Sequence, residues 1–249
     1  MMVYFPDNIF TRILFNSLVE EEQKKIKFQS SSLLSQSISQ EENSIALIPT
    51  LDIITHPELH FSSSTGISFD ASLCNSFIYY EPGKDEIEKV NISGDISSMD
   101  VLLLKIFFKE LYNSEPEIKL RPNLPDKTSE NYFISGDENF RKRRYEKGIS
   151  FSEEMIEIIS APYVNFILAS KNKKLIEDYS AVLLTALESL DYNSESHYSF
   201  DTASSEFIKK NMVSVVYDFS EQDIVGIKEL VQLPYFHGYT NEIVDLKLV

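Results

Sequence analysis

The sequence is poor in glycine and contains one cysteine. Only seven of its 249 residues are glycine, and none of the glycine-rich signatures of nucleotide-binding loops or kinases is present. Since Cys74 is the only cysteine, the chain cannot form a disulfide within itself. These shortages argue against a phosphate-cradling loop and against a disulfide-stabilised fold.

Positive charge is also scarce. The chain has 23 lysines and arginines against 39 aspartates and glutamates, which gives a formal net charge of −16. A surface this negative repels phosphate backbones and anionic lipid headgroups, so we expect neither a nucleic acid nor a membrane as partner. A small anionic ligand would need hydrogen-bond donors gathered locally in its pocket.

No long apolar run is present. The longest, Val101 to Phe108, is interrupted by Lys105 and is far shorter than a membrane crossing. The first seven residues lack the basic segment and apolar stretch of a secretory signal. A cytoplasmic location is therefore the expectation.

Clusters of metal-ligating residues are missing as well. His56 and His60 are four residues apart, but Pro57 argues against a continuous helix through them, and no carboxylate-rich motif follows. His197 and His237 stand alone. We expect no metal and no cofactor, and Cys74 is read as a small buried apolar residue.

Short apolar strands alternate with amphipathic helices along the chain. Residues 45–48 read as a buried strand, and residues 98–111 read as a strong helix. This alternation predicts an α/β fold. A break at residues 81–84 and a return strand at residue 163 predict two lobes: residues 1–85 with 163–249 form the first, and residues 86–162 form the second. Such a chain would have the two-lobed architecture of periplasmic-binding-protein-type folds, with a ligand cleft between the lobes.

Small polar residues follow several of these strands. Thr50 ends one strand, Ser97 and Ser98 follow another, and Asp137 follows a third. Ligands of open α/β sheets collect beyond the carboxyl ends of strands. In the segment 94–98, either serine would cap the next helix, whose free N–H groups would bind a carboxylate; a plain helix cap explains the pattern equally well.

Two further features have alternative interpretations. Asp137 would hold a cleft loop or cap a helix that begins near Glu138. The basic run from Arg141 to Arg144, with Lys147, would clamp an anion or form the solvated face of a helix.

Taken in order, several segments resemble the MqnA/MqnD family of menaquinone biosynthesis. The resemblance lies in residues 45–50, 94–105, 134–137 and 152–164, and it continues into residues 207–227. It is closer to MqnA, the chorismate dehydratases of the futalosine pathway. The family resemblance implies a type 2 periplasmic-binding-protein fold, used by an enzyme without metal or organic cofactor.

The resemblance also implies a substrate and a site. The substrate would be a small organic anion like chorismate, which loses water to give 3-[(1-carboxyvinyl)oxy]benzoate; no oligomeric state is implied. By similarity, Ser97 and Ser98 would hold a carboxylate, Thr50 and Ser76 would line the first lobe, and Asp137 would shape the second. Asn8, displaced by two positions from the family's substrate-contacting Asn, is the catalytic candidate.

Two alternatives remain open. Pro6, Met99 and Asp100 stand at positions where the family has other residues, and they favour a non-catalytic protein that binds a small molecule with the same fold. An MqnD-like 1,4-dihydroxy-6-naphthoate synthase is the other alternative, although the histidine typical of that branch is not evident.

Overall fold

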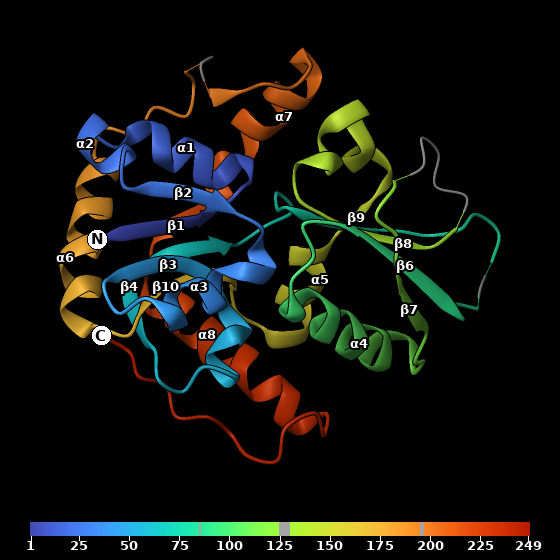
Figure 1. Cartoon of the computed structure of the whole chain (residues 1–249). Coiled ribbons are helices and arrows are strands. Elements are labelled where there is room, and N and C mark those ends of the chain that lie inside the picture. The colour runs from blue at the N-terminus through green and yellow to red at the C-terminus, as the bar shows by residue number, and fades with distance from the viewer. Residues whose placement is uncertain (85, 125–129, 195–196) are drawn as a thin grey trace.

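A computed structural model describes residues 1–84, 86–124, 130–194 and 197–249, and it contains two β-sheets that lie side by side (Figure 1). The larger sheet has six strands in the order β11-β4-β10-β3-β1-β2. These strands are β1 (Met2–Pro6), β2 (Ile26–Gln29), β3 (Ser44–Pro49), β4 (His60–Phe69), β10 (Tyr163–Ser170) and β11 (Val215–Asp218).

The smaller sheet has five strands in the order β7-β6-β8-β5-β9. They are β5 (Ser76–Tyr79), β6 (Lys89–Gly94), β7 (Glu117–Leu120), β8 (Tyr132–Ser135) and β9 (Ile149–Ser150). In each sheet a group of three neighbouring strands is parallel: β1 with β2 and β3 in the larger sheet, and β6 with β7 and β8 in the smaller one. The remaining pairings in both sheets are antiparallel.

Helices and short 3₁₀ segments surround the two sheets. The α-helices are α1 (Ile9–Ser17), α2 (Glu20–Gln23), α3 (Leu34–Gln40), α4 (Ser98–Tyr112), α5 (Phe151–Ile159), α6 (Lys173–Leu187), α7 (Thr202–Asn211) and α8 (Glu221–Phe236). The 3₁₀ segments include η1 (Ser31–Leu33), η2 (Thr50–Ile54), η3 (Asp137–Asn139), η4 (Arg141–Lys147) and η6 (Met212–Ser214). No helix in the described part of the chain is long and apolar enough to cross a membrane.

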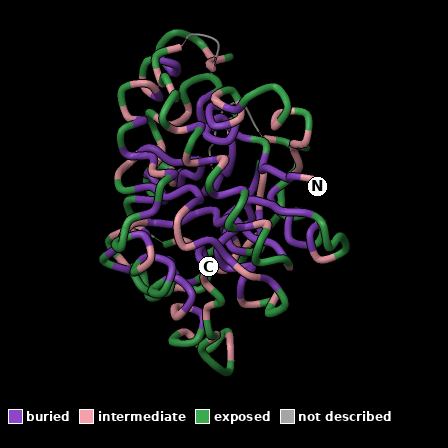
Figure 2. Tube along the Cα trace, turned by 90° about the vertical axis from the view of Figure 1, so that its left-hand side faces the viewer, coloured by how far each residue is buried: buried purple, intermediate pink, exposed green. Residues whose placement is uncertain are grey.

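The centre of the larger sheet is fully buried. Every residue of β3 and of β10 is buried, and both strands are apolar runs without strict alternation. This pattern is typical of strands that are covered on both faces. Helix α3 packs against β3, α8 packs against β10, and α6 packs against β4 and β10. Figure 2 shows the buried segments gathered in the interior of the molecule.

Each sheet, with its helices, forms one lobe, so the predicted two-lobed α/β architecture is confirmed. Lobe I is built on the larger sheet and lobe II on the smaller one. The chain leaves lobe I after β4, through residues 70–75, and returns to it at β10, through residues 160–162. Cys74, in the first crossing, is fully buried, and its Sγ donates to the carbonyl of Ser76.

The first crossing lies earlier than the boundary predicted at residue 85. Strand β5 pairs with β8 and β9, so residues 76–79 belong to lobe II. The alternating pattern of residues 66–80 reads as continuous because strands on both sides of the crossing have the same period of two. The turn-forming residues 81–84 lie within lobe II, after β5.

Aromatic side chains connect the lobes beside the first crossing. Phe10 of α1 packs edge-on against Phe69 of β4 and against Phe140 of lobe II, with ring centroids 5.1 and 6.2 Å apart. Phe140 also packs edge-on against Phe77 of β5 at 6.4 Å. All four rings are buried. Together these four residues form the interlobe aromatic cluster.

Helix α8 packs closely against the second crossing. Its N-terminus has a capping box between Ser220 and Asp223. Further along, Gly226 allows a close approach: a Cβ at this position would lie 2.2 Å from the carbonyl oxygen of Pro162. That carbonyl belongs to rigid backbone, so it cannot move aside as a flexible side chain would.

We therefore expect Gly226→Ala to destabilise the protein by about 1–3 kcal/mol, the usual cost of forcing extra volume into a packed site. Val225→Ala, at the exposed neighbouring position, is the matched control and should have a much smaller effect. Urea unfolding followed by circular dichroism measures both variants. Equal stability of the Gly226 variant and the wild type would contradict the close packing described here.

Candidate functional site

Each lobe has a pair of parallel strands whose carboxyl ends point toward the other lobe, and these four strand ends meet at the boundary between the lobes. From lobe I come the segments after β1 and β3, and from lobe II come those after β6 and β8. Hydrogen bonds join these segments across the boundary: Asp137 of η3 accepts from the backbone of Ile9, and Asp52 of η2 accepts from Ser98 of α4. We call this boundary the seam. The strand ends singled out in the sequence therefore do converge.

Asn8, the predicted catalytic residue, caps helix α1. Its Oδ1 accepts from the backbone N–H of Thr11 at 3.1 Å, and the Thr11 side chain completes a capping box. Asn8 is buried, and its Nδ2 is a donor without a hydrogen-bond partner among the residues that the structure describes. A buried unpaired donor costs free energy, so this amide is the part of Asn8 that a ligand atom would satisfy.

Thr50 and Ser76 are also buried and are bonded within the chain. The Thr50 hydroxyl donates to the carbonyl of Val164 on β10 at 2.7 Å. The Ser76 hydroxyl donates to Ser135 on β8 at 3.1 Å. Ser76 begins β5 and therefore belongs to lobe II, which corrects its expected place in the first lobe. Their predicted substrate contacts stay predictions.

Ser97 and Ser98 lie at the start of α4. Ser97 is the N-cap: its hydroxyl accepts from the backbone of Asp100, and the Asp100 carboxylate accepts from the backbone N–H of Ser97 at 2.8 Å. The Ser98 hydroxyl donates to Asp52 Oδ1 at 2.8 Å, across the seam. The helix-cap interpretation thus describes Ser97, while Ser98 contacts a carboxylate that belongs to the chain itself.

Three carboxylates surround this helix start. Burial raises the pKa of Asp100 to about 6; hydrogen bonds from Ser97 act against this rise, and the negative charges of Asp95 and Asp52 add to it. A ligand carboxylate arriving here would meet the same repulsion. The electrostatics of the α4 end of the seam are therefore unfavourable for an anion.

Asp137 lies at a different end of the seam, against the start of α1. Its Oδ1 accepts from the backbone N–H of Ile9 at 2.8 Å. Burial raises the pKa of Asp137 to about 6, and the charge of Asp7 adds to the rise. The hydrogen bond from Ile9 and the charges of Arg12 and Arg141 act in the opposite direction. Asp137 is thus a carboxylate that changes protonation close to neutral pH.

A cavity of about 450 Å³ opens beside Asp137, which we call the seam cavity. This volume lies within the range of small-molecule sites. Both lobes and the segment before α7 contribute to its lining: Asp7, Ile9, Arg12, Phe15, Asn16, Asp137, Arg141, His197 and Ser199. Two of the five arginines of the chain are in this set. They balance the formal charges of the two aspartates, so the cavity is locally neutral in a chain of net charge −16.

Each arginine of the seam cavity is held by a carboxylate of its own lobe. Arg12 pairs with Asp7 at 2.5 Å and lies over the ring of Phe28, 4.7 Å from its centroid. Arg141 pairs through Nε with Glu138 at 2.9 Å. A guanidinium carries five N–H donors, so one ion pair leaves others able to contact a ligand. Each lobe therefore contributes one positively charged side chain to the lining of the cavity.

His197 is oriented by two neighbours at the same cavity. The amide Nδ2 of Asn16 is 3.0 Å from Nδ1 of His197, and Nε2 of the ring is 2.9 Å from the carbonyl of Asp191. Since an amide nitrogen donates and a carbonyl accepts, these contacts assign the proton to Nε2. The two contacts therefore fix the orientation of the imidazole ring beside the cavity.

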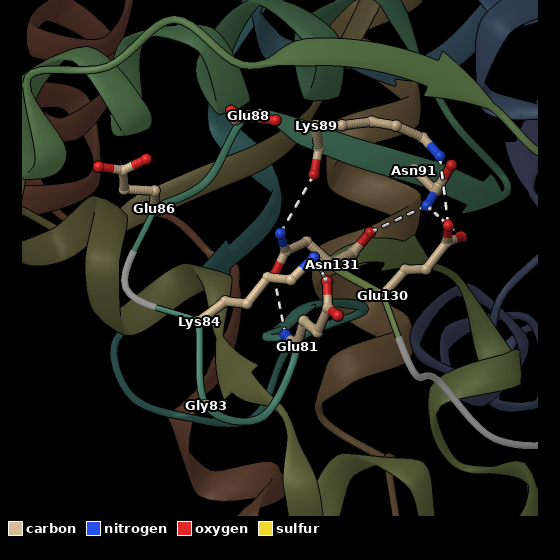
Figure 3. Close-up of a pocket in the computed structure, with 9 residues that line it drawn as sticks. All are labelled: Glu81, Gly83, Lys84, Glu86, Glu88, Lys89, Asn91, Glu130 and Asn131. Carbon is tan, nitrogen blue, oxygen red and sulfur yellow. Dashed lines mark hydrogen bonds and ion pairs between the residues drawn. The ribbon is translucent and has the colours of Figure 1, made fainter.

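A larger cavity of about 700 Å³ lies in lobe II, beside the first residues of β6 and β8 (Figure 3). It is at the amino ends of these parallel strands, opposite the edge where such folds bind ligands. Its lining has four glutamates and two lysines, and two of the contacts are ion pairs: Lys84 with Glu81 at 3.0 Å and Lys89 with Glu130 at 3.4 Å. Its net charge disfavours anions, so the seam cavity is the candidate site.

Among the described residues no group of three or more histidine, cysteine, aspartate or glutamate side chains could hold a metal ion. The basic run 141–147 does contribute to the site through Arg141. Instead of a regular helix face it forms a 3₁₀ segment, with Lys142 and Arg143 at positive φ. Sequence reasoning missed Arg12, which lies on the polar side of α1 without any distinguishing pattern.

Comparison with known proteins identifies the fold. No protein-family model and no curated protein match the sequence. Among solved structures, protein AF1704 from Archaeoglobus fulgidus is similar with a TM-score of 0.70 and 14% identity, covering 96% of this chain and 98% of that one.

Two transport proteins are similar over comparable lengths. The zinc-bound ligand-binding component of an ABC-type import system from Staphylococcus aureus has a TM-score of 0.60 and 11% identity, covering 97% of this chain and 92% of that one. The periplasmic aliphatic sulphonate binding protein SsuA from Escherichia coli also has a TM-score of 0.60 and 11% identity, covering 99% and 90%. This chain has the two-lobed fold of periplasmic binding proteins. The predicted fold class is confirmed.

The raised pKa of Asp137 has a consequence for stability. The folded-state pKa of about 6 exceeds the unfolded value of about 3.9, so ionised Asp137 opposes folding above pH 6, and this penalty disappears as the pH falls toward 4. Relative to Asp137→Asn, the wild type should gain on the order of 2 kcal/mol in free energy of unfolding between pH 7.5 and pH 4.

Urea unfolding at a series of pH values measures this difference. Asp218→Asn, at an exposed aspartate of β11, is the control for the substitution itself. A constant difference between wild type and Asp137→Asn across this pH range would show that folding does not raise the pKa of Asp137.

Proposed function

We propose that this protein binds a small organic anion in the seam cavity, between Arg12 of lobe I and Arg141 of lobe II. The observation that carries the proposal is the placement of these two arginines, from different lobes, around one cavity of about 450 Å³. Guanidinium groups recognise carboxylates through paired, charge-assisted hydrogen bonds. A ligand that contacts both would also join the two lobes.

Asp137 sets the conditions for binding. Its carboxylate is within electrostatic range of both arginines and accepts from the N-terminus of α1. An anionic ligand must therefore share these positive groups with Asp137, or bind when Asp137 is protonated. Protonation leaves the cavity with a net positive charge, so anion binding should strengthen as the pH falls toward 6.

Neutralising either arginine should weaken binding of a dicarboxylate. We expect Arg12→Gln and Arg141→Gln each to raise the Kd for chorismate about tenfold or more, since hydrogen bonds to charged groups contribute about 1.5–3 kcal/mol. Isothermal titration calorimetry measures this. Arg143→Gln, two residues from Arg141 and outside the cavity lining, is the matched control and should leave the Kd unchanged. Equal affinity in all variants would place the ligand elsewhere.

The finer proposal is that the bound anion is chorismate and that the protein is an MqnA-like chorismate dehydratase. Support comes from the family resemblance in the sequence and from two arginines that match the two carboxylates of chorismate. Loss of water needs a group that accepts a proton as hydroxide departs. Asp137, with a pKa of about 6, is a suitable general base at this cavity. Asn8, whose free amide donor lies in the adjacent helix cap, would contact the substrate.

Turnover distinguishes this proposal from simple binding. Wild-type protein with chorismate should yield 3-[(1-carboxyvinyl)oxy]benzoate, followed by chromatography with mass detection. Asp137→Asn should still bind chorismate and lose at least about a hundredfold in kcat, the usual contribution of a positioned general base.

Binding without product in the wild type would establish the non-catalytic alternative, for which the buried, helix-capping position of Asn8 is the structural argument. Turnover of a cyclic futalosine-type substrate instead would indicate the MqnD-like activity.

A further inference from the structure

Away from the seam cavity, two aspartates cross the seam in opposite directions. Asp95, after β6 of lobe II, contacts residues of lobe I at the start of η1. Its Oδ1 accepts from the backbone N–H of Ser31 at 2.9 Å and from the hydroxyl of Ser30 at 2.7 Å, and its Oδ2 accepts from the hydroxyl of Ser31 at 2.6 Å. Both oxygens of this carboxylate are thus bonded to the other lobe.

Asp52 makes the reverse contact. It belongs to η2 of lobe I and accepts from the hydroxyl of Ser98, the first residue of α4 in lobe II, at 2.8 Å. Its other oxygen accepts from Ser35 of α3, within its own lobe, which fixes the direction of the side chain. Each lobe therefore contributes one aspartate that accepts hydrogen bonds from the other lobe. We call Asp52 with Ser98, and Asp95 with Ser30 and Ser31, the aspartate clasp.

The Asp95 half of the clasp adds little to the internal folding of lobe II, whereas Asp52 also accepts from Ser35 within lobe I. The hydrogen bonds of the Asp95 side chain all go to lobe I, 64 or 65 residues away in sequence. Hydrogen bonds to a charged acceptor are short and about twice as strong as neutral ones. Their energy therefore acts on the relative position of the lobes.

The charges of the clasp oppose its hydrogen bonds. Asp52 and Asp95 both act electrostatically on the buried Asp100, so three carboxylates share this end of the seam. Burial also raises the pKa of Asp52, and His56 acts in the opposite direction. Like charges repel each other. The hydrogen bonds donated by the serines therefore hold the two lobes together at this end of the seam. Replacing the serines alone would leave this repulsion unopposed, whereas replacing the aspartates removes the hydrogen bonds and the repulsion together.

We propose that the aspartate clasp is a fastening device that holds the two lobes together without any ligand, and that its release opens this end of the seam. The interlobe aromatic cluster of Phe10, Phe69, Phe77 and Phe140 lies beside the first crossing and serves as the pivot. The inference goes beyond the proposed function, because the clasp joins the lobes through this chain's own carboxylates and involves no residue of the seam cavity lining.

Small-angle X-ray scattering tests the clasp directly on the intact chain. A compact protein of this length has a radius of gyration of about 18 Å. We expect Asp52→Ala with Asp95→Ala to raise the radius of gyration by about 1 Å or more over that value, with each single variant in between. Asp218→Ala, which removes an exposed aspartate outside the clasp, should match the wild type.

Hydrogen-exchange mass spectrometry separates opening from unfolding. In the double variant, peptides covering residues 30–35 and 95–100 should exchange at least about tenfold faster, whereas those from β3 and β10 should keep their protection. An unchanged radius of gyration and unchanged exchange would overturn the proposal. Loss of protection throughout would also overturn it, because the aspartates would then support the fold rather than fasten the lobes. No ligand enters either experiment, so failure of anion binding leaves this result unaffected.

Discussion

The convergence of four parallel strand ends on one seam is the constraint on which the site depends. Strands β1 and β3 point their carboxyl ends at lobe II, and β6 and β8 point theirs at lobe I. Whatever side chains follow these strands must therefore meet. Asn8, Asp52, Ser98 and Asp137 all reach the seam in this way, although up to 129 residues separate them in sequence. The crossing points of the chain fix the distance between the two sets.

The same constraint brings carboxylates of the chain itself to the boundary between the lobes. Three aspartates of this chain accept hydrogen bonds from the opposite lobe, and burial raises the pKa of two of them, Asp52 and Asp137. At the α4 end the acids outnumber the bases around the helix start. At the α1 end Arg12 and Arg141 restore neutrality. The two ends of the seam therefore differ in their balance of charge.

Much of this arrangement was predictable from the sequence. Apolar runs followed by small polar residues located β3, β6 and β8, and a helix cap was predicted at either Ser97 or Ser98. The first crossing was misplaced because a period of two continues from residue 66 to residue 80 on both sides of it. Strand β7 is short and most of its residues are exposed, so no buried apolar run identifies it in the sequence. The partners of Asp52 and Asp95 depend on tertiary contacts, which no local pattern encodes.

The burial of the only thiol turns the first crossing into a reporter. Cys74 is fully buried and its sulfur is bonded to the backbone of Ser76. A maleimide or nitrobenzoate reagent can reach that atom only when the covalent link between the lobes loses its structure. Dyes can accordingly be attached to cysteines introduced on the outer faces of the two lobes with little background labelling. The wild-type chain is thus a suitable background for fluorescence studies of interlobe motion, because its own cysteine would react little with the dyes.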